Sequence, residues 1–214
     1  NLGGIARATV IAESIDGVTA FGTGPGDMLM DRIMALSSGG SERFDRDGKE
    51  ASKGKVNEAL LKELLSDPYY IKQPPKSTGE ELFGSAVAER LYGMVTGGKI
   101  TLSDLMATVL ALTVESISLS YEKFIFPEHK ISEVILSGGG CRNAFLVEKH
   151  GERLGGIKLT TPSYRPTPRR RSPSPYWRTS ASRGTPATCP ASRGRGGVFR
   201  SGKYRPEAST KTYT

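Results

Sequence analysis

A glycine-rich turn, Thr23-Gly24-Pro25-Gly26, joins a β-favouring run over residues 18–21 directly to a helix-like run that begins at Asp27. Glycines at a strand–helix junction let the backbone approach a ligand closely, and the N–H groups at the start of the helix favour an anion. This junction requires a strand end, a turn and a helix start to meet at one point. We therefore expect a ligand-binding loop on an α/β fold.

The rest of the chain also alternates between strand and helix patterns. β-Favouring runs predict strands over residues 8–12, 18–21 and 131–136, and Asp16-Gly17 is a hairpin turn signal between the first two. Apolar spacing predicts helices over residues 27–36, 57–65, 79–95, 105–121 and 143–149. Thr101 and Asp104 have the spacing of a helix cap before the fourth of these helices.

The charge is divided unevenly along the sequence. Residues 1–162 carry 18 Lys and Arg against 21 Asp and Glu, whereas residues 163–214 carry 12 Lys and Arg against Glu207 alone. The second part is also rich in Pro and Ser, which cannot build an apolar core. We predict a folded body over residues 1–162 and a disordered basic tail over residues 163–214.

Composition bears on the cellular location of the protein. No stretch of about 18 apolar residues indicates a membrane span, so no membrane partner is expected. The two cysteines, Cys141 and Cys189, lie in unlike surroundings and indicate neither a metal site nor a disulfide framework. A reducing, cytoplasmic location is the prediction.

Two further glycine turns complete a set of three. Asn1-Leu2-Gly3-Gly4 opens the sequence, and Gly138-Gly139-Gly140 follows the last predicted strand. Neither has the spacing of a P-loop or of a Rossmann fingerprint, and each alone is compatible with an ordinary turn. Together they favour an arrangement in which two glycine turns hold phosphate and the apolar strand with its three glycines holds adenosine.

Three more motifs lie between these turns: Phe44-Asp45-Arg46-Asp47-Gly48, Gly54-Lys55-Val56-Asn57 and Pro74-Pro75-Lys76-Ser77-Thr78-Gly79. In this order, the motifs up to about residue 161 resemble the anhydro-N-acetylmuramic acid kinase family, within the actin/hexokinase/Hsp70-like ATPase superfamily. The resemblance implies a ribonuclease H-like, actin-like ATPase lobe. It also implies an ATP-dependent kinase that opens the anhydro bridge of 1,6-anhydro-N-acetylmuramic acid with water and phosphorylates the 6-oxygen.

The resemblance assigns roles to particular residues. ATP and Mg²⁺ are the implied cofactors, the anhydro-amino sugar is the implied substrate, no Mg²⁺ ligand is identified, and a homodimer is compatible with the family. The implied nucleotide-binding residues are Gly3, Gly4, Gly138, Gly139, Gly140 and Asn143. The implied sugar-binding residues are Thr23, Gly24, Pro25, Gly26 and Asp27.

The sequence departs from the family at the position of the general base. The family motif is Phe-Asp-Thr-Gly-Pro-Gly-Asn, and here Gly22 stands at the Asp position and Asp27 at the Asn position. A positioned base contributes about 10²–10⁴ in rate, and the tight turn separates Asp27 from Gly22. Because the sequence also matches only the C-terminal lobe, with the N-terminal lobe absent, we expect no intact catalytic residue and no activity in this chain.

Three alternatives remain open. The basic tail, with Tyr164, Tyr176 and Trp177, suits single-stranded nucleic acid, so the chain can be read as a non-catalytic nucleic-acid-binding protein. The tail over residues 165–193 can instead be a shifted reading frame, because the next frame allows a helix-forming segment like the family's continuation. A related amino-sugar kinase with a different substrate is the third.

Overall fold

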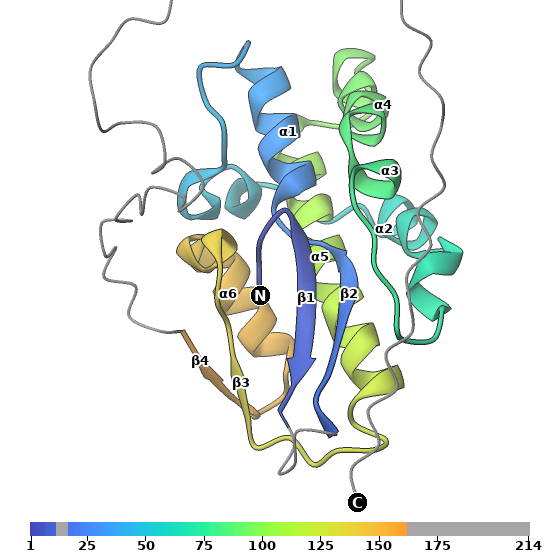
Figure 1. Ribbon diagram of the computed structural model, residues 1–214. Helices are drawn as coiled ribbons and strands as arrows, with labels where there is room; N and C mark the ends of the chain where they lie inside the picture. The colour runs from blue at the N-terminus through green and yellow to red at the C-terminus, as the bar shows by residue number, and fades with distance from the viewer. Residues whose placement is uncertain (12–16, 162–214) are drawn as a thin grey trace, which may run out of the picture. The chain divides into compact units, whose positions relative to one another are not determined.

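Two antiparallel strands, β1 (Ile5–Val10) and β2 (Thr19–Pro25), lie at the centre of the fold (Figure 1). The computed structural model describes residues 1–11 and 17–161, all within one compact unit. The inward side chains of β1 alternate with exposed ones, as expected for a strand with one buried face. A register shift between Ala6 and Arg7 marks a bulge in the pairing. The predicted hairpin is therefore confirmed in its strands, while its turn lies outside the described residues.

Five helices follow β2 along the chain. Their bounds are α1 (Met28–Ser37), α2 (Glu58–Leu65), α3 (Glu80–Phe83), α4 (Ser85–Thr96) and α5 (Leu102–Phe124). Short 3₁₀ turns separate them: η2 (Arg46–Gly48), η3 (Ala51–Lys53) and η4 (Pro68–Ile71). Asn57 and Thr101 cap α2 and α5 by accepting hydrogen bonds from the backbone of Leu60 and Asp104.

A second small sheet closes the described part of the chain. Strands β3 (Glu133–Ile135) and β4 (Lys158–Thr160) pair in parallel and are connected by η5 (Gly139–Arg142) and α6 (Ala144–Arg153). The crossover helix is what a parallel pair requires. Figure 1 shows α6 beside this pair and α5 behind β1 and β2. The α/β fold class is thus confirmed.

The long helix α5 supplies much of the core. Its 23 residues include 13 buried ones, which face α1, α2, α4 and α6 as well as the strands. By length and hydropathy α5 is the one helix in the described part that could cross a membrane, yet 67% of its most apolar window is buried in the structure. Burial on several sides explains its near-continuous apolar sequence.

Two predicted elements differ in detail. The helix predicted over residues 79–95 is broken at Gly84, whose backbone is extended (φ −86°, ψ −156°). A Cβ there would lie 2.2 Å from the Glu80 carbonyl oxygen, so this break requires glycine. The strand predicted over residues 131–136 is only three residues long and is not fully buried, since Ile135 is 59% exposed. The predicted tail lies outside the described residues, so its disorder and the domain boundary stay predictions.

Candidate functional site

The three glycine turns meet at one end of the strands. The backbone N–H groups of Gly26 and Asp27 donate to the carbonyl oxygens of Gly4 and Gly3, at 2.9 and 3.0 Å. The Leu2 carbonyl accepts from the N–H of Gly140 at 2.9 Å. The convergence that the order of the turns predicted is therefore present, and the turns are joined directly through their backbones.

Glycine is needed here for contact between backbones. A Cβ on Gly26 would lie 1.8 Å from the Gly3 carbonyl oxygen, and one on Gly138 would lie 2.3 Å from the Leu2 carbonyl oxygen. Gly138 also has a φ of +102°, a backbone conformation that residues with a side chain rarely adopt. The N–H groups of Gly26 and Asp27 are used by contacts with Gly4 and Gly3, so these two groups are not available to an anion.

The predicted sugar-binding residues differ in their burial. Thr23, Gly24, Pro25 and Gly26 are all buried, and the Thr23 hydroxyl has no hydrogen-bond partner among the described residues. Asp27 is half-buried and borders open space on two sides. Of the five, Asp27 lines the cavity described next, and the role of the other four stays a prediction.

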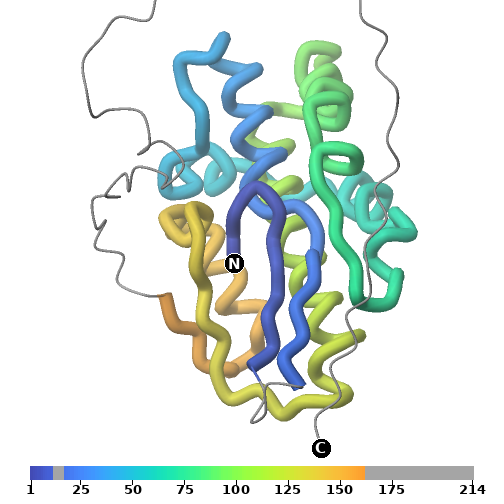
Figure 2. The backbone as a smooth tube through the Cα atoms, in the orientation of Figure 1, coloured from blue at the N-terminus to red at the C-terminus, as the bar shows by residue number. Residues whose placement is uncertain are grey.

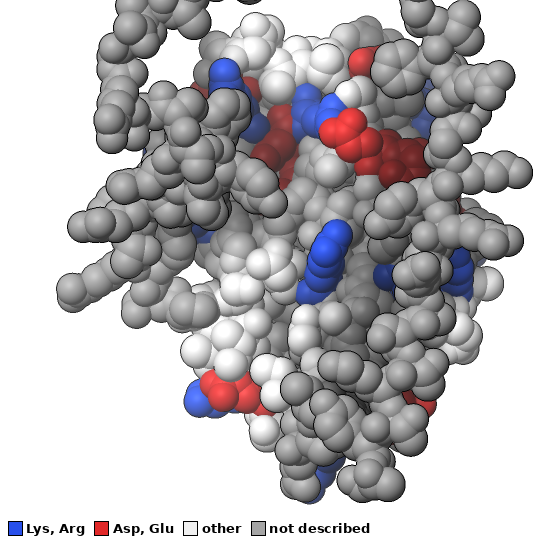
Figure 3. All heavy atoms as spheres, viewed as in Figure 1, with Lys and Arg blue, Asp and Glu red and all other residues white. Residues whose placement is uncertain are grey.

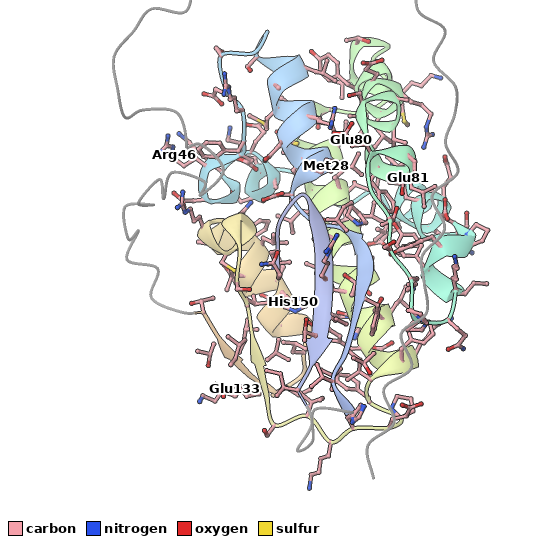
Figure 4. The ribbon with its side chains drawn as sticks, viewed as in Figure 1. Met28, Arg46, Glu80, Glu81, Glu133 and His150 are labelled. Carbon is pink, nitrogen blue, oxygen red and sulfur yellow. The ribbon has the colours of Figure 1, made fainter. Side chains whose placement is uncertain are left out.

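A cavity of about 380 Å³ lies beside Asp27. It separates the start of α1 from η5 and from the loop that contains η2, and Figure 4 shows Arg46 on that loop. Its lining residues are Asp27, Met30, Asp31, Phe44, Asp45, Arg46, Asp47, Gly139, Gly140, Arg142, Asn143 and Leu146. Three predicted nucleotide-binding residues, Gly139, Gly140 and Asn143, thus share one cavity with Asp27, while Gly138 and Gly3 do not line it.

A shallower hollow lies on the other side of Asp27. It includes Gly4, Met28, Asp31 and Arg43, so Asp27 and Asp31 border both spaces. Figure 3 shows acidic and basic side chains gathered over the part of this face where α1 lies in Figure 1. Gly4 is therefore near Asp27, but on the opposite side from Gly139 and Gly140.

Asp27 and Asp31 form the electrostatic centre of this region. They stand one helical turn apart, so their side chains lie on the same side of α1. Burial, together with the smaller effect of the neighbouring Asp27 carboxylate, raises the pKa of Asp31 to about 7. Burial also raises the pKa of Asp27 above its ordinary value. Two carboxylates that are costly to ionise together are suited to bind a cation or a proton between them.

The loop over residues 44–48 forms one wall of the cavity. The Asp45 carboxylate accepts hydrogen bonds from the N–H groups of Glu50 and Ala51, at 2.8 and 2.9 Å, so it is engaged in holding the loop. Asp47 has φ of +57°, an uncommon conformation for a residue with a side chain. The Arg46 guanidinium lies 5.6 Å from the centre of the Phe44 ring. This wall therefore presents a cation and an aromatic ring.

The opposite wall is the glycine turn that precedes α6. Asn143 caps α6 by accepting a hydrogen bond from the Leu146 N–H at 3.0 Å. A Cβ on Gly139 would stand 3.6 Å from Asp27 Oδ2, so a ligand can approach that backbone closely. Among the described residues, the N–H groups of Gly138 and Gly139 make no backbone hydrogen bond, so they remain available to a ligand.

Gly22, which the sequence resemblance aligns with the family's base, is not among the residues that line this cavity. It is buried, its N–H donates to the Lys76 carbonyl at 2.9 Å, and its carbonyl accepts from the Tyr69 hydroxyl at 2.8 Å. Lys76 Nζ donates to the carbonyl oxygens of Tyr69 and Tyr70, and burial lowers the Lys76 pKa to about 8. Glycine brings no carboxylate to this position.

The cavity residues fit a magnesium nucleotide. Mg²⁺ prefers carboxylate oxygen ligands and phosphate, and Asp27 and Asp31 supply two carboxylates beside a close-approach glycine backbone. The volume lies within the range of about 300–1,000 Å³ for small-molecule sites. A larger cavity of about 570 Å³ lies between η3, α5 and α6, but it contacts none of the predicted site residues.

Sequence reasoning missed Asp31 and gave the loop over residues 44–48 no role in the site. Asp31 could have been found from its i, i+4 spacing to Asp27 on a predicted helix. No local signal brings Gly48 close to Asn143, because that proximity depends on how α6 packs against η2.

Comparisons with known proteins agree with the resemblance. A family model described as anhydro-N-acetylmuramic acid kinase matches residues 1–167. A protein of that name from Caldanaerobacter subterraneus is 44% identical over 163 residues, covering 75% of this chain and 41% of the relative. Proteins of the same name from Clostridioides difficile and Francisella tularensis are each 37% identical, over 163 and 162 residues. The chain spans about two-fifths of the length of these relatives.

Proposed function

Because the chain belongs to the anhydro-N-acetylmuramic acid kinase family, we propose that it forms part of an actin-like ATPase lobe that binds ATP with Mg²⁺. The proposed site is the cavity between α1, η5 and the loop over residues 44–48. When bound there, ATP would supply the phosphoryl group and Mg²⁺ would offset the charge on its oxygens, with Asp27 and Asp31 as the residues that would hold the metal. The proposed acceptor is the 6-oxygen of 1,6-anhydro-N-acetylmuramic acid, and the proposed location is the cytoplasm.

The observation that carries this proposal is the position of Asp27 and Asp31 opposite Gly139 and Gly140. Burial of both carboxylates makes their joint ionisation unfavourable, and a divalent cation relieves that cost. The free N–H of Gly139 offers a hydrogen bond to an anionic oxygen on the facing wall. The two walls are thus complementary to a metal–phosphate pair.

We further propose that this chain alone binds nucleotide without turning over the sugar. Gly22 brings no carboxylate to activate water, and Asp27 lies on the far side of a turn whose residues are buried. Replacing Gly22 with Asp alone is therefore expected to leave sugar phosphorylation undetectable.

Titration of the purified chain with MgATP tests the proposal. Saturable binding is expected, and Asp31→Asn is expected to weaken it about tenfold, as for the loss of one charge-assisted contact. Glu148→Gln, on the exposed side of α6 and away from the cavity, is the matched control and should bind like the parent chain. Equal binding by Asp31→Asn and the parent, or no binding at millimolar MgATP, would contradict the proposal.

The same titration separates the alternatives. A different amino-sugar substrate is indicated if another anhydro or amino sugar, but not 1,6-anhydro-N-acetylmuramic acid, changes the apparent affinity for MgATP. A nucleic-acid-binding function is indicated by binding of single-stranded RNA that weakens steeply with salt while MgATP has no effect.

A further inference from the structure

The cavity beside Asp27 contains one carboxylate that has no partner in the protein. Asp27, Asp31, Asp45 and Asp47 all line this cavity. The Asp45 carboxylate accepts two backbone hydrogen bonds, and the proposed metal site uses Asp27 and Asp31. The Asp47 side chain makes no hydrogen bond or ion pair within the described part of the chain. Its carboxylate is therefore available to a ligand in the cavity.

The backbone on both sides of Asp47 is held in place. Before it, the Asp45 carboxylate is bonded to the turn that follows, and the Gly48 N–H donates to the Asp45 carbonyl at 3.3 Å. After it, a Cβ on Gly48 would lie 2.5 Å from Phe145 Cβ and 2.6 Å from Asn143 Oδ1. Figure 2 shows this part of the chain beside the start of α6. Asp47 thus has a defined position on the cavity wall.

The backbone conformation of Asp47 is left-handed, with φ +57° and ψ +17°. Among residues with a side chain, Asn and Asp adopt this conformation most readily, and glycine adopts it without cost. The conformation therefore accounts for a small residue here but not for a negative charge. It also means that Asp47→Asn and Asp47→Gly can change the carboxylate while the loop keeps its shape.

The charge of Asp47 determines which part of a nucleotide can lie beside it. A carboxylate accepts hydrogen bonds, donates none, and repels the oxygens of a phosphate. A triphosphate bound through Mg²⁺ at Asp27 and Asp31 therefore does not extend along Asp47. The group beside Asp47 must be uncharged and must carry hydrogen-bond donors, as the ribose and the amino group of adenine do.

The ribose fits this position better than the base does. The ribose is attached directly to the α-phosphate, so it lies nearer to the metal than the base. Its adjacent 2′- and 3′-hydroxyls can both donate to the two oxygens of one carboxylate, whereas adenine carries a single amino group. Phe44, on the same cavity wall, is 52% exposed and offers the base a ring on which to stack.

We propose that Asp47 binds the ribose of the nucleotide through its 2′- and 3′-hydroxyls, so that the cavity selects ribonucleotides over deoxyribonucleotides. This inference rests on the proposed nucleotide site and assigns a residue to a part of the ligand that Asp27 and Asp31 do not contact. Because Asp47 stands outside the proposed metal site, its loss should weaken the binding of MgATP without abolishing it.

Titration of the full chain with ATP, 2′-deoxy-ATP and 3′-deoxy-ATP, each with Mg²⁺, tests the proposal. The parent chain should bind ATP about tenfold more tightly than either deoxynucleotide, as for the loss of one hydrogen bond to a charged group. Asp47→Gly should bind all three nucleotides with the same, lower affinity. Asp47→Asn keeps a neutral acceptor oxygen and should retain part of the preference for ATP.

Glu42→Gln is the matched control for charge. Glu42 is an exposed acid close to the same loop, and it does not line the cavity. This variant loses one negative charge, as Asp47→Asn does, and should keep the full preference of the parent for ATP. A purely structural role for Asp47 predicts a different pattern, in which Asp47→Gly changes the melting temperature but not the ratio of the affinities for ATP and 2′-deoxy-ATP.

Several outcomes overturn the proposal. Equal affinity of the parent for ATP and both deoxynucleotides contradicts it and leaves the proposed function intact, as does an unchanged ATP preference in Asp47→Gly. Weaker binding of inosine triphosphate, which lacks the amino group, with equal binding of the deoxynucleotides would place Asp47 at the base instead. If no nucleotide binds at millimolar concentration, the proposed function fails and this inference fails with it.

Discussion

The hydroxyl of Tyr69 donates a hydrogen bond of 2.8 Å to the carbonyl oxygen of Gly22 and lies 2.6 Å from the point where a Cβ on Gly22 would stand. Tyr69 is 7% exposed, and its ring packs edge-on against Tyr70 and Phe83 at 6.0 and 6.1 Å. The ring cannot move freely, so the backbone at residue 22 is fitted to glycine in this chain.

Gly22→Ala is expected to destabilise the protein by about 1–3 kcal/mol, the usual cost of added volume in a packed interior. Tyr69→Phe removes the hydroxyl that the new Cβ would meet and costs about 1 kcal/mol through its lost hydrogen bond. The double variant should lose less free energy of unfolding than the sum of the losses in the two single variants. Urea unfolding of all four proteins measures this coupling; strict additivity would show that the Tyr69 hydroxyl is not the obstacle.

Gly26→Ala should be the most damaging of the glycine substitutions at the three turns. Its Cβ would stand 1.8 Å from the Gly3 carbonyl oxygen, a backbone atom that cannot step aside without breaking the contact between turns. We expect a loss of about 3 kcal/mol in the free energy of unfolding.

Gly93→Ala is the matched control for that substitution. Gly93 lies exposed inside α4, with nothing within 4 Å of an added Cβ. Alanine there should stabilise the protein by about 0.5–1 kcal/mol, because glycine is a poor helix former. Opposite signs for the two variants in thermal unfolding are the expected result, and similar destabilisation by both would contradict it.

Asp31 should make stability fall as pH rises. Its pKa is raised from 3.8 to about 7 by burial, so between these pH values the folded protein keeps a proton that the unfolded chain releases. The free energy of unfolding therefore decreases across this window, and Asp31→Asn should remove that decrease. Unfolding by urea at several pH values measures it; an identical pH dependence in the two proteins would contradict the assignment.

His150 should act in the opposite direction. It is 1% exposed on α6, both ring nitrogens lack partners among the described residues, and burial lowers its pKa from 6.5 to about 4 (Figure 4). Between pH 6.5 and about 4, His150 is protonated in the unfolded chain but still neutral in the folded protein. The free energy of unfolding therefore decreases as the pH falls through this range.

His150→Phe keeps a ring against Tyr121, whose centroid lies 5.9 Å from that of His150, and removes the titration. The variant should lose less stability than the parent between pH 6.5 and 4. His129→Phe, the same exchange at a partly buried histidine, is the matched control. The Asp31 and His150 effects on the free energy of unfolding have opposite signs over overlapping pH ranges, so they partly cancel in the parent protein. Each single variant should therefore reveal the pH dependence of the residue that remains.

Several elements follow from local patterns alone. The caps at Asn57, Thr101 and Asn143 place the starts of α2, α5 and α6 correctly, because each side chain bonds a backbone N–H three residues later. The break at Gly84 and the partnership of Asp27 with Asp31 were visible in principle, through a glycine inside a helical pattern and an i, i+4 spacing. The position of the cavity wall formed by residues 44–48 could not be predicted from local sequence, because it depends on contacts with α6.

The sequence by itself determined the family, the α/β alternation and the meeting of three glycine turns. Strand, turn and helix signals are local, and their order along the chain identifies the arrangement. Tertiary structure decided which groups at that meeting point are free. It assigned the N–H groups of Gly26 and Asp27 to contacts between turns, and it brought the loop over residues 44–48 into one cavity with Asp27 and Gly139. Hydrogen-bond partners and desolvation depend on residues far apart in the chain, so packing alone settles them.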